Sequence, residues 1–369
     1  MRVSRYLRRV STAPTLLAVV CSIGSAGALG MKNNLADAQP VNSDTAVPVP
    51  GGAVVRHGRA DAWPTFAACE RAAKVGDPDA EAQLGFMYQA GAGVEASPEK
   101  AFHWYQLAAS SGQLRAKVNM AVMYAWGMGV TRDDAMAARL FREAAEKGDG
   151  TAASYLGDLY FFGRGVPHDV NEAEHWYGRG IKLHDPMAAY NLGILKTGQY
   201  GHAVDLNKAI SLLKKSADAG YVPAMHQLGL LYVRNPRLGD GATAKQLLEA
   251  ASDAGNWRSS IVIALLNRDG KFVPANAERA YYYFRLAALQ GGDAARQLVA
   301  ADTRRLESIL AADETAAEGA QAEAWHRDHN HVLAFVDKKR NAWSVYPAPM
   351  LAGDADDTHA RRPASIPPA

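Results

Sequence analysis

The sequence predicts an all-α protein, folded as a right-handed α-solenoid of antiparallel helix hairpins. The first observation is a repeat: small residues return at intervals of 36 residues, and once of 35, at positions 85, 121, 157, 193, 229 and 264. The second is that each interval holds two amphipathic stretches with helical spacing, such as 80–88 and 101–108. Neither stretch can bury its apolar face alone. A fixed period of roughly 20 to 50 residues is typical of solenoids, in which stacked hairpins share one core.

Paired glycines mark the boundary between the two helices of a repeat. Gly91 and Gly93 precede Val94, and the same pattern returns at 127–130 and 163–166. Because glycine adopts a positive φ without strain, we expect the first helix to end at the first glycine of each pair. A single left-handed glycine is also expected after the second helix, at 112, 148, 220, 255 and 291. His184 takes this place in the third repeat, where we expect backbone strain.

The full pattern is Ala-x3-Leu-Gly-x2-Tyr-x2-Gly-x-Gly-Val, then a polar loop, Lys/Glu-Ala, Trp-Tyr, Ala-Ala and a closing glycine. It resembles the Sel-one-like repeat (SLR), a relative of the tetratricopeptide repeat (TPR). The resemblance covers residues 63–292 and is strongest in the first and third repeats. The second repeat has Met120-Ala121 in place of Leu-Gly, and the fourth to sixth lose much of the glycine loop, as at 234–238. The resemblance implies an SLR/TPR-like superhelix that serves as a binding scaffold.

The repeats set the predicted domain boundaries. We assign 1–30 to a signal peptide or signal anchor, 31–62 to a flexible linker and 63–292 to the solenoid. The solenoid opens with a half-repeat at 63–76, followed by six hairpins that begin near Asp79, Leu114, Thr151, Pro186, Val222 and Trp257. Capping helices are expected within 293–327: a further first helix at 294–301 and a longer helix from Leu306 to Trp325. The tail, 328–369, is expected to be of low order, apart from a β-hairpin of 331–336 and 342–346.

The first 30 residues have the layout of a secretory signal. Arg2, Arg5, Arg8 and Arg9 precede an apolar stretch at 16–20, and small residues at 26–28 or 36–38 offer a cleavage site. We therefore expect export to the periplasm. The alternative is an uncleaved anchor in the inner membrane, because the uncharged run at 11–31 is long enough to span a bilayer.

The charge balance gives no indication of a nucleic-acid partner. The formal net charge is +2, and without the four N-terminal arginines 36 basic residues face 38 acidic ones. Cys21 falls within the signal segment, which leaves Cys69 without a partner for an intrachain disulfide. We expect Cys69 to pack as a small apolar side chain, at the position that Tyr105 has one repeat later.

The candidate partner-binding surface is the concave face. In TPR-like solenoids the first helix of each hairpin lines this face, and its positions outside the intra-repeat packing meet the ligand. These positions hold Gln83, Phe86, Asn119, Val122, Trp126, Tyr155, Asp158, Phe162, Asn191, Ile194, Gln227, Leu230 and Arg234. Aromatic rings offer rigid contact area, and amides can hydrogen-bond a peptide main chain. The alternative is that single aromatics only fill the joints between repeats.

Other candidate sites are weaker. His326 and His329 would share a helical face near His331, which suits a transition metal, but no distant motif completes such a site and we assign no metal. The basic run 338–340 is expected at a solvated turn, with weak contact to anionic lipid if the protein is anchored. The sequence shows no nucleophile elbow, phosphate loop or zinc-protease motif, so we assign no catalytic residue and no cofactor.

These observations predict a non-enzymatic scaffold that binds a protein or peptide in its concave groove. The resemblance implies an adaptor in the bacterial cell envelope, with roles in envelope assembly, exopolysaccharide secretion, signalling or virulence. Two alternatives stay open. One is a periplasmic regulator that holds a membrane sensor inactive, and the other is an enzyme acting on cell-wall material.

Overall fold

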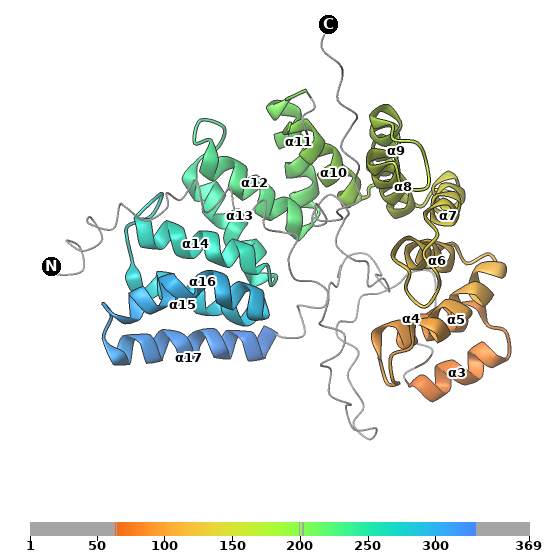
Figure 1. Cartoon of the computed structure of the whole chain (residues 1–369), viewed down its shortest axis with the longest axis horizontal. Helices are drawn as coiled ribbons and strands as arrows, with labels where there is room; N and C mark the ends of the chain where they lie inside the picture. Colours follow the sequence, from red (N-terminus) through yellow and green to blue (C-terminus); the bar gives the residue numbers. More distant parts are fainter. Residues whose placement is uncertain (1–62, 64, 199, 201–202, 330–369) are drawn as a thin grey trace, which may run out of the picture.

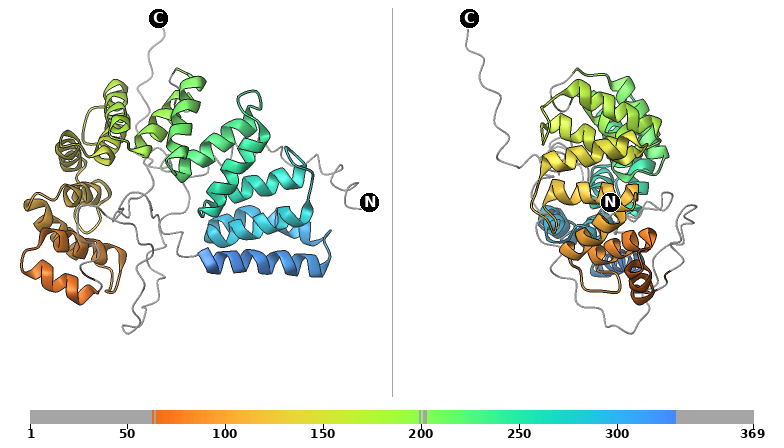
Figure 2. Two further views of the ribbon diagram at one scale, coloured as in Figure 1. Left: turned by 180° about the vertical axis from the view of Figure 1, so that it is seen from behind. Right: turned by 90° about the vertical axis from the view of Figure 1, so that its right-hand side faces the viewer.

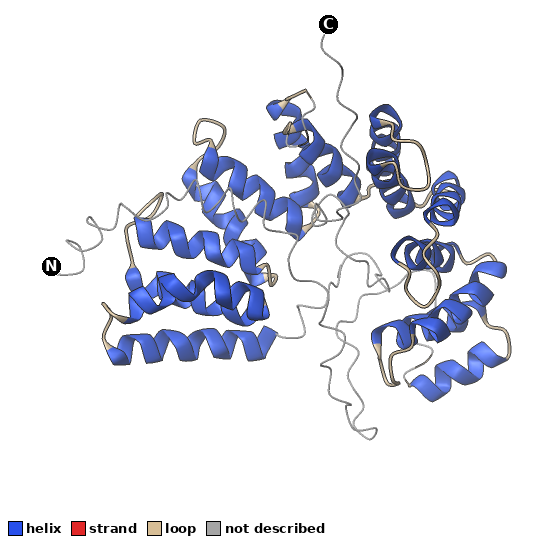
Figure 3. Ribbon diagram, viewed as in Figure 1, coloured by secondary structure: helices blue, strands red, loops and turns tan. Residues whose placement is uncertain are grey.

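The computed structural model describes residues 63, 65–198, 200 and 203–329, and the regular elements in these residues are all α-helices (Figure 3). They are α3 Phe66–Lys74, α4 Pro78–Ala90, α5 Pro98–Ser110, α6 Leu114–Trp126, α7 Asp134–Glu146, α8 Gly150–Phe162, α9 Val170–Lys182, α10 Pro186–Lys196, α11 Leu206–Asp218, α12 Val222–Arg234, α13 Gly241–Asp253, α14 Trp257–Asp269, α15 Ala277–Gln290, α16 Gly292–Glu307 and α17 Ala312–His329. The predicted signal segment, linker and tail hairpin lie outside the described residues.

The helices pair in chain order. Each of α4, α6, α8, α10, α12 and α14 packs against the helix that follows it, and each second helix also contacts the first helix of the next pair. Figure 1 shows the pairs along an open arc with α3 at one end and α17 at the other, and the view from behind in Figure 2 shows the same order. The predicted α-solenoid is confirmed. The six first helices begin within one residue of their predicted starts.

Side-chain caps fix where the second helix of each pair begins. A Ser, Asp or Asn stands at all six N-caps, and its side chain accepts a hydrogen bond from a backbone N–H of the first turn. These residues are Ser97, Asp133, Asp169, Asp205, Asp240 and Asn276. They follow the repeat period, so the polar loop of the sequence pattern is the place of a helix cap.

The glycine loop within a pair packs against the preceding pair. Gly127 ends α6 with φ +67°, and Gly129 follows with φ +64°. A Cβ at Gly129 would lie 2.6 Å from the backbone nitrogen of Glu99, at the start of α5. The second glycine is therefore needed both for its φ and because the loop comes close to a neighbouring backbone.

The sixth repeat keeps this loop shape without the second glycine. Gly270 ends α14 with φ +66°, and Phe272 stands in the place of the second glycine with φ +64°. At the start of α13 the residue opposite is Gly241, where a Cβ would lie 2.8 Å from Phe272 Cβ. In this repeat glycine stands at the start of the neighbouring helix and not in the loop, and its missing side chain leaves room for the phenylalanine ring.

The ends of the second helices follow the prediction with one exception. His184 has φ +60° in the place of the glycine, as expected. Gly291 is not left-handed, because α15 continues to Gln290 and Gly292 takes the positive φ of +60° instead. The extra residue in α15 shifts the turn by one position.

The C-terminal helices depart from the predicted layout. The longer helix was expected to begin at Leu306, but α16 continues to Glu307 and α17 begins at Ala312. Between them, Glu314 Oε2 accepts a hydrogen bond at 2.8 Å from the backbone N–H of Ala311. This side chain satisfies a donor at the start of a helix and so favours a new helix there. α17 packs against α15, the second helix of the last pair.

The apolar core consists of two large clusters. One is centred on α3–α8 and the other on α10–α17. A smaller cluster of Phe161, Ala173, Tyr177, Leu192 and Leu195 lies at the joint between the third and fourth pairs. This joint also contains buried polar side chains of the predicted stripe.

Candidate partner-binding surface

Most of the predicted concave stripe is buried in the structure. Seven of its thirteen side chains are at most 8% exposed: Asn119, Val122, Tyr155, Asp158, Asn191, Ile194 and Leu230. Five are half-buried, namely Gln83, Phe86, Trp126, Gln227 and Arg234, and Phe162 is 38% exposed. The assignment of the stripe to partner binding stays a prediction. Only its half-buried and exposed members are accessible at the surface.

Tyr155 shows how an aromatic residue of the stripe becomes buried. Its ring stacks on Phe141 of α7 at 5.1 Å between centroids, and Trp126 of α6 meets it edge-on at 5.7 Å. Tyr155 therefore fills the joint between the second and third pairs, which is the alternative that the sequence left open. Trp126 itself is half-buried, so part of this aromatic group stays accessible.

Asp158 and Asn191 take part in a buried polar contact between the third and fourth pairs. Asp158 Oδ1 accepts hydrogen bonds from Tyr177 Oη and from Asn191 Nδ2, both at 2.7 Å. Burial raises the pKa of Tyr177, and the nearby Asp158 carboxylate raises it further, so the hydroxyl keeps the proton that it donates. Because α8, α9 and α10 each contribute one residue, the contact joins the two pairs.

Arg164 is a residue near this surface that the prediction missed. It lies in the glycine loop after α8, and its guanidinium stands over the ring of Trp126, 5.8 Å from the centroid. An ion pair at 2.7 Å joins it to Asp134. Burial raises the pKa of Asp134, but hydrogen bonds from Arg164 and Arg132 outweigh it and hold the pKa below its usual value. The variable position between the two glycines was the signal that could have identified Arg164.

A buried histidine joins the fifth and sixth pairs. His226 Nδ1 and Ser259 Oγ are hydrogen-bonded at 2.7 Å, and both residues are buried. Burial lowers the pKa of His226 to about 3, with further contributions from the positive charges of Arg258 and Arg234. His226 is therefore neutral at neutral pH and serves as a packing residue.

Of the C-terminal histidines, His329 is bonded to its own helix, whereas His326 Nδ1 is buried without a hydrogen-bond partner among the described residues. His329 Nδ1 is hydrogen-bonded to the carbonyl oxygen of Trp325 at 2.8 Å, and the two rings stack at 4.3 Å. His331 lies outside the described residues. In the part of the chain that the structure describes, no three His, Cys, Asp or Glu side chains come together as a metal ion would need.

Cys69 is fully buried, as expected for a packing residue. Its thiol donates a hydrogen bond to the carbonyl oxygen of Ala80 at 3.3 Å, and burial raises its pKa to about 12. A thiol with so high a pKa is a poor nucleophile. As for the membrane, no helix within the described ranges combines the length and apolar character that crossing a bilayer requires.

The fold is similar to a solved structure, that of a Sel1 repeat protein from Oxalobacter formigenes. Sequence identity is 27% and the TM-score is 0.52, over 60% of this chain and 98% of that chain. A Sel1 repeat protein from Klebsiella pneumoniae subsp. pneumoniae matches 56% of this chain and 99% of its own, with 20% identity and a TM-score of 0.39.

Sequence comparison also finds DAP3-binding cell death enhancer 1 of Mus musculus, which is 32% identical over 90 residues. The match covers 24% of this chain and only 18% of that relative's length. The Sel1 repeat matches much more of the chain, at residues 78–113, 114–149, 150–185, 186–221, 222–256 and 263–292. Sel1 repeat proteins are non-enzymatic scaffolds that bind protein partners. Since the six matches cover more than half of the sequence, this chain belongs to the Sel1 repeat family.

Proposed function

We propose that this protein is an exported adaptor of the bacterial cell envelope, which binds a segment of a partner protein on the first-helix face of its solenoid. The observation that carries the proposal is the half-buried group formed by Trp126 and Arg164, with the exposed Phe162 two residues before Arg164 in the chain. Trp and Arg are the residue types that contribute most to protein interfaces. A tryptophan at a packed joint with an arginine above its ring offers a rigid platform for a partner chain.

The reachable members of the stripe suit a partner with an exposed main chain. Gln83 and Gln227 are half-buried amides, which can donate to a carbonyl and accept from an N–H. Phe86 and Trp126, which lie between Gln83 and Gln227 in the sequence, offer apolar contact area. This mixture fits an extended segment of a protein, which presents main-chain groups and side chains together.

Export is proposed from the sequence alone. The arginine-rich start and the apolar stretch at 16–20 lie outside the described residues, so their reading as a secretory signal rests on composition. Fractionation of cells that produce the full chain, with N-terminal sequencing of the product, tests it. An unprocessed protein in the soluble cytoplasmic fraction would contradict export, and an unprocessed protein in the membrane fraction would favour the anchor.

Partner capture tests the binding face. Affinity capture of the native protein is compared with the double variant Trp126→Ala/Phe162→Ala, and we expect the variant to lose partners that the wild type recovers. The control is Val75→Ala/Leu298→Ala, which removes two exposed apolar side chains that lie outside the stripe. All variants must show the wild-type helical circular dichroism spectrum. Equal recovery by both double variants would remove this face from the proposal.

A further inference from the structure

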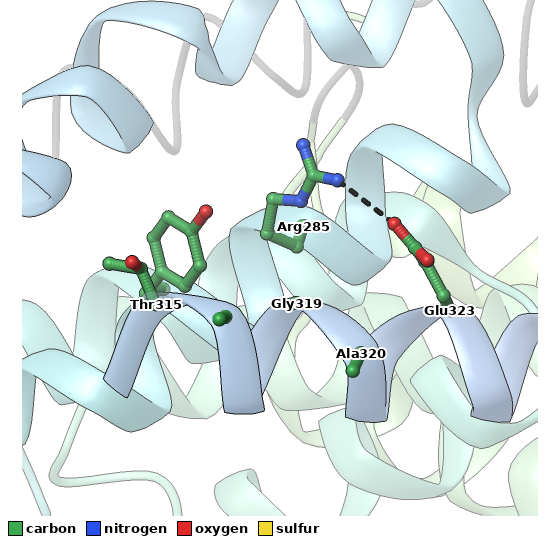
Figure 4. A pocket seen from close by; sticks show the side chains of 7 residues that line it. Arg285, Thr315, Gly319, Ala320 and Glu323 are labelled. Atoms are coloured by element: carbon green, nitrogen blue, oxygen red, sulfur yellow. Dashed lines mark hydrogen bonds and ion pairs between the residues drawn. The ribbon is translucent and has the colours of Figure 1, made fainter. Parts of the chain in front are cut away.

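α17 leaves a hollow against α15 at the end of the solenoid. Its volume is about 350 Å3. Tyr281 and Arg285 of α15 form one side, and Thr315, Gly319, Ala320 and Glu323 of α17 form the other. Figure 4 shows Arg285 above α17, between Thr315 and Glu323, with Gly319 below it.

Gly319 keeps the hollow open. The residue is buried, yet a Cβ at this position would meet no atom within 4 Å. Glycine inside a helix is less favourable than alanine, because it has more conformational freedom to lose on folding. Neither a positive φ nor a close neighbour requires glycine here. The empty space is therefore a feature of this helix that packing does not explain.

Arg285 presents unused hydrogen-bond donors to the hollow. A guanidinium carries five N–H donors. Within the described residues its acceptor is Glu323, whose Oε1 lies 3.3 Å from Nη2, and Nε is buried without an acceptor. The two side chains are 36% and 50% exposed. A single contact of this length between exposed charges is weak, so another carboxylate can replace it.

The other polar groups of the hollow already use their donors. Tyr281 Oη donates to Glu307 Oε1 at 3.2 Å, and Thr315 Oγ1 donates to the carbonyl oxygen of Ala312 at 3.0 Å. Among the lining side chains, Arg285 is therefore the one with hydrogen-bond donors left for a ligand. Its planar fork matches the two oxygens of a carboxylate better than any neutral group.

We propose that this hollow is a docking site for a glutamate or aspartate side chain of a protein partner, bound by Arg285. Ala316 and Ala320 are exposed and small, so a partner backbone can approach α17 closely enough for a short acidic side chain to reach the arginine. The site uses α15 and α17, whereas the stripe uses α4 to α12. The inference therefore goes beyond the proposed adaptor face and adds a second contact surface to it.

A defined probe tests this site on the full chain. Blocked glutamate, N-acetylglutamate N-methylamide, is titrated at constant ionic strength while 1H–15N NMR follows the Nε–H of Arg285, which is identified by its loss in Arg285→Lys. We expect a saturable shift with this probe and no shift with the matching glutamine and lysine compounds. Glu323→Gln should bind the probe several-fold more tightly, because it removes the competing carboxylate.

Two leucine variants of α17 separate docking from folding. Gly319→Leu fills the hollow and should weaken probe binding about tenfold or more. Ala317→Leu places the same side chain at an exposed position outside the hollow and should bind like the wild type. Equal binding by the two variants, a saturable shift with the lysine compound, or none with the glutamate compound would overturn the proposal. Since the stripe residues take no part in this test, its failure leaves the adaptor proposal unaffected.

Discussion

The contact between Gly241 and Phe272 offers a quantitative test of how neighbouring repeats fit together. In the second repeat, Gly129 passes the start of the preceding α5, where Pro98 and Glu99 stand. In the sixth repeat the loop residue is Phe272, and glycine stands at the start of the preceding helix instead. Gly241→Ala should therefore create a clash that exists only while Phe272 is present.

The expected magnitude follows from two opposing effects. The new Cβ would lie 2.8 Å from Phe272 Cβ and 2.7 Å from its Cγ, and overpacking of this kind costs about 1–3 kcal/mol. Replacing glycine by alanine in a helix gains at most about 1 kcal/mol. We expect Gly241→Ala to lower the free energy of unfolding by about 1–2 kcal/mol.

Phe272→Gly changes the sign of this effect. Glycine at 272 relieves a left-handed backbone conformation that costs a non-glycine residue about 1–2 kcal/mol, against the loss of a ring that is 38% exposed. In this background Gly241→Ala meets no ring and should be neutral or stabilising. The combination restores the arrangement of residues found in the second repeat.

The assay is a double-mutant cycle in urea, followed by circular dichroism, with hydrogen exchange of the α13 and α14 amides. Exchange is included because a repeat array can unfold in parts and so depart from a two-state transition. Faster exchange in Gly241→Ala should be confined to the last pairs. If Gly241→Ala lowers the free energy of unfolding equally with and without Phe272, the contact between these residues does not cause the destabilisation and the reasoning is refuted.

Three further predictions concern the packing of helices within and between pairs. Unfolded His226 binds a proton near its usual pKa of 6.5, but folded His226 binds one only near pH 3. The free energy of unfolding should therefore fall as the pH drops below about 6.5, by roughly 3 kcal/mol at pH 4.5, and His226→Gln should remove this contribution in pH-dependent urea unfolding. Gly157→Ala places a Cβ 2.7 Å from Tyr177 Cδ1 and should cost about 1–3 kcal/mol in the same assay. Tyr177→Phe removes a hydrogen bond to Asp158 and should lower the free energy of unfolding by about 1.5–3 kcal/mol. The control is Tyr88→Phe, which changes a buried tyrosine without such a bond and should leave the free energy of unfolding almost unchanged. Equal losses of stability in the two variants would contradict the role given to Asp158.

The architecture could be predicted well from the sequence because the repeated signals determine structure within a single repeat. The spacing of apolar residues, the glycine pairs and Pro186 at a helix start all determine structure within one repeat. The caps at Asp133 and Asp169 recur at the same spacing and were visible as a polar loop. Each of these signals depends on the local chain, so its position in the repeat is enough to interpret it.

Contacts outside the repeat pattern could not be predicted in this way. Arg285 and Glu323 are 38 residues apart, and the helix carrying Glu323 packs on α15 beyond the last repeat. Composition shows that this helix is polar but not which side meets α15. At the break before Ala312, the Glu314 side chain accepts a hydrogen bond from the backbone N–H of Ala311, in a stretch where no repeat supplies a template.

The predicted stripe shows that the position of a residue in the repeat does not determine how deeply its side chain is buried. Gln83, Asn119, Tyr155, Asn191 and Gln227 occupy the same repeat position, yet the first and last are half-buried and the middle three are buried. Periodicity assigns a position to a face, but burial depends on what the neighbouring pair contributes: Phe141 and Trp126 pack on Tyr155, and Asn191 hydrogen-bonds Asp158. The same reasoning explains the choice of Trp126 and Phe162 for the capture experiment. Replacing Tyr155 would open the joint between two pairs, so lost binding would report a packing defect as readily as a lost contact.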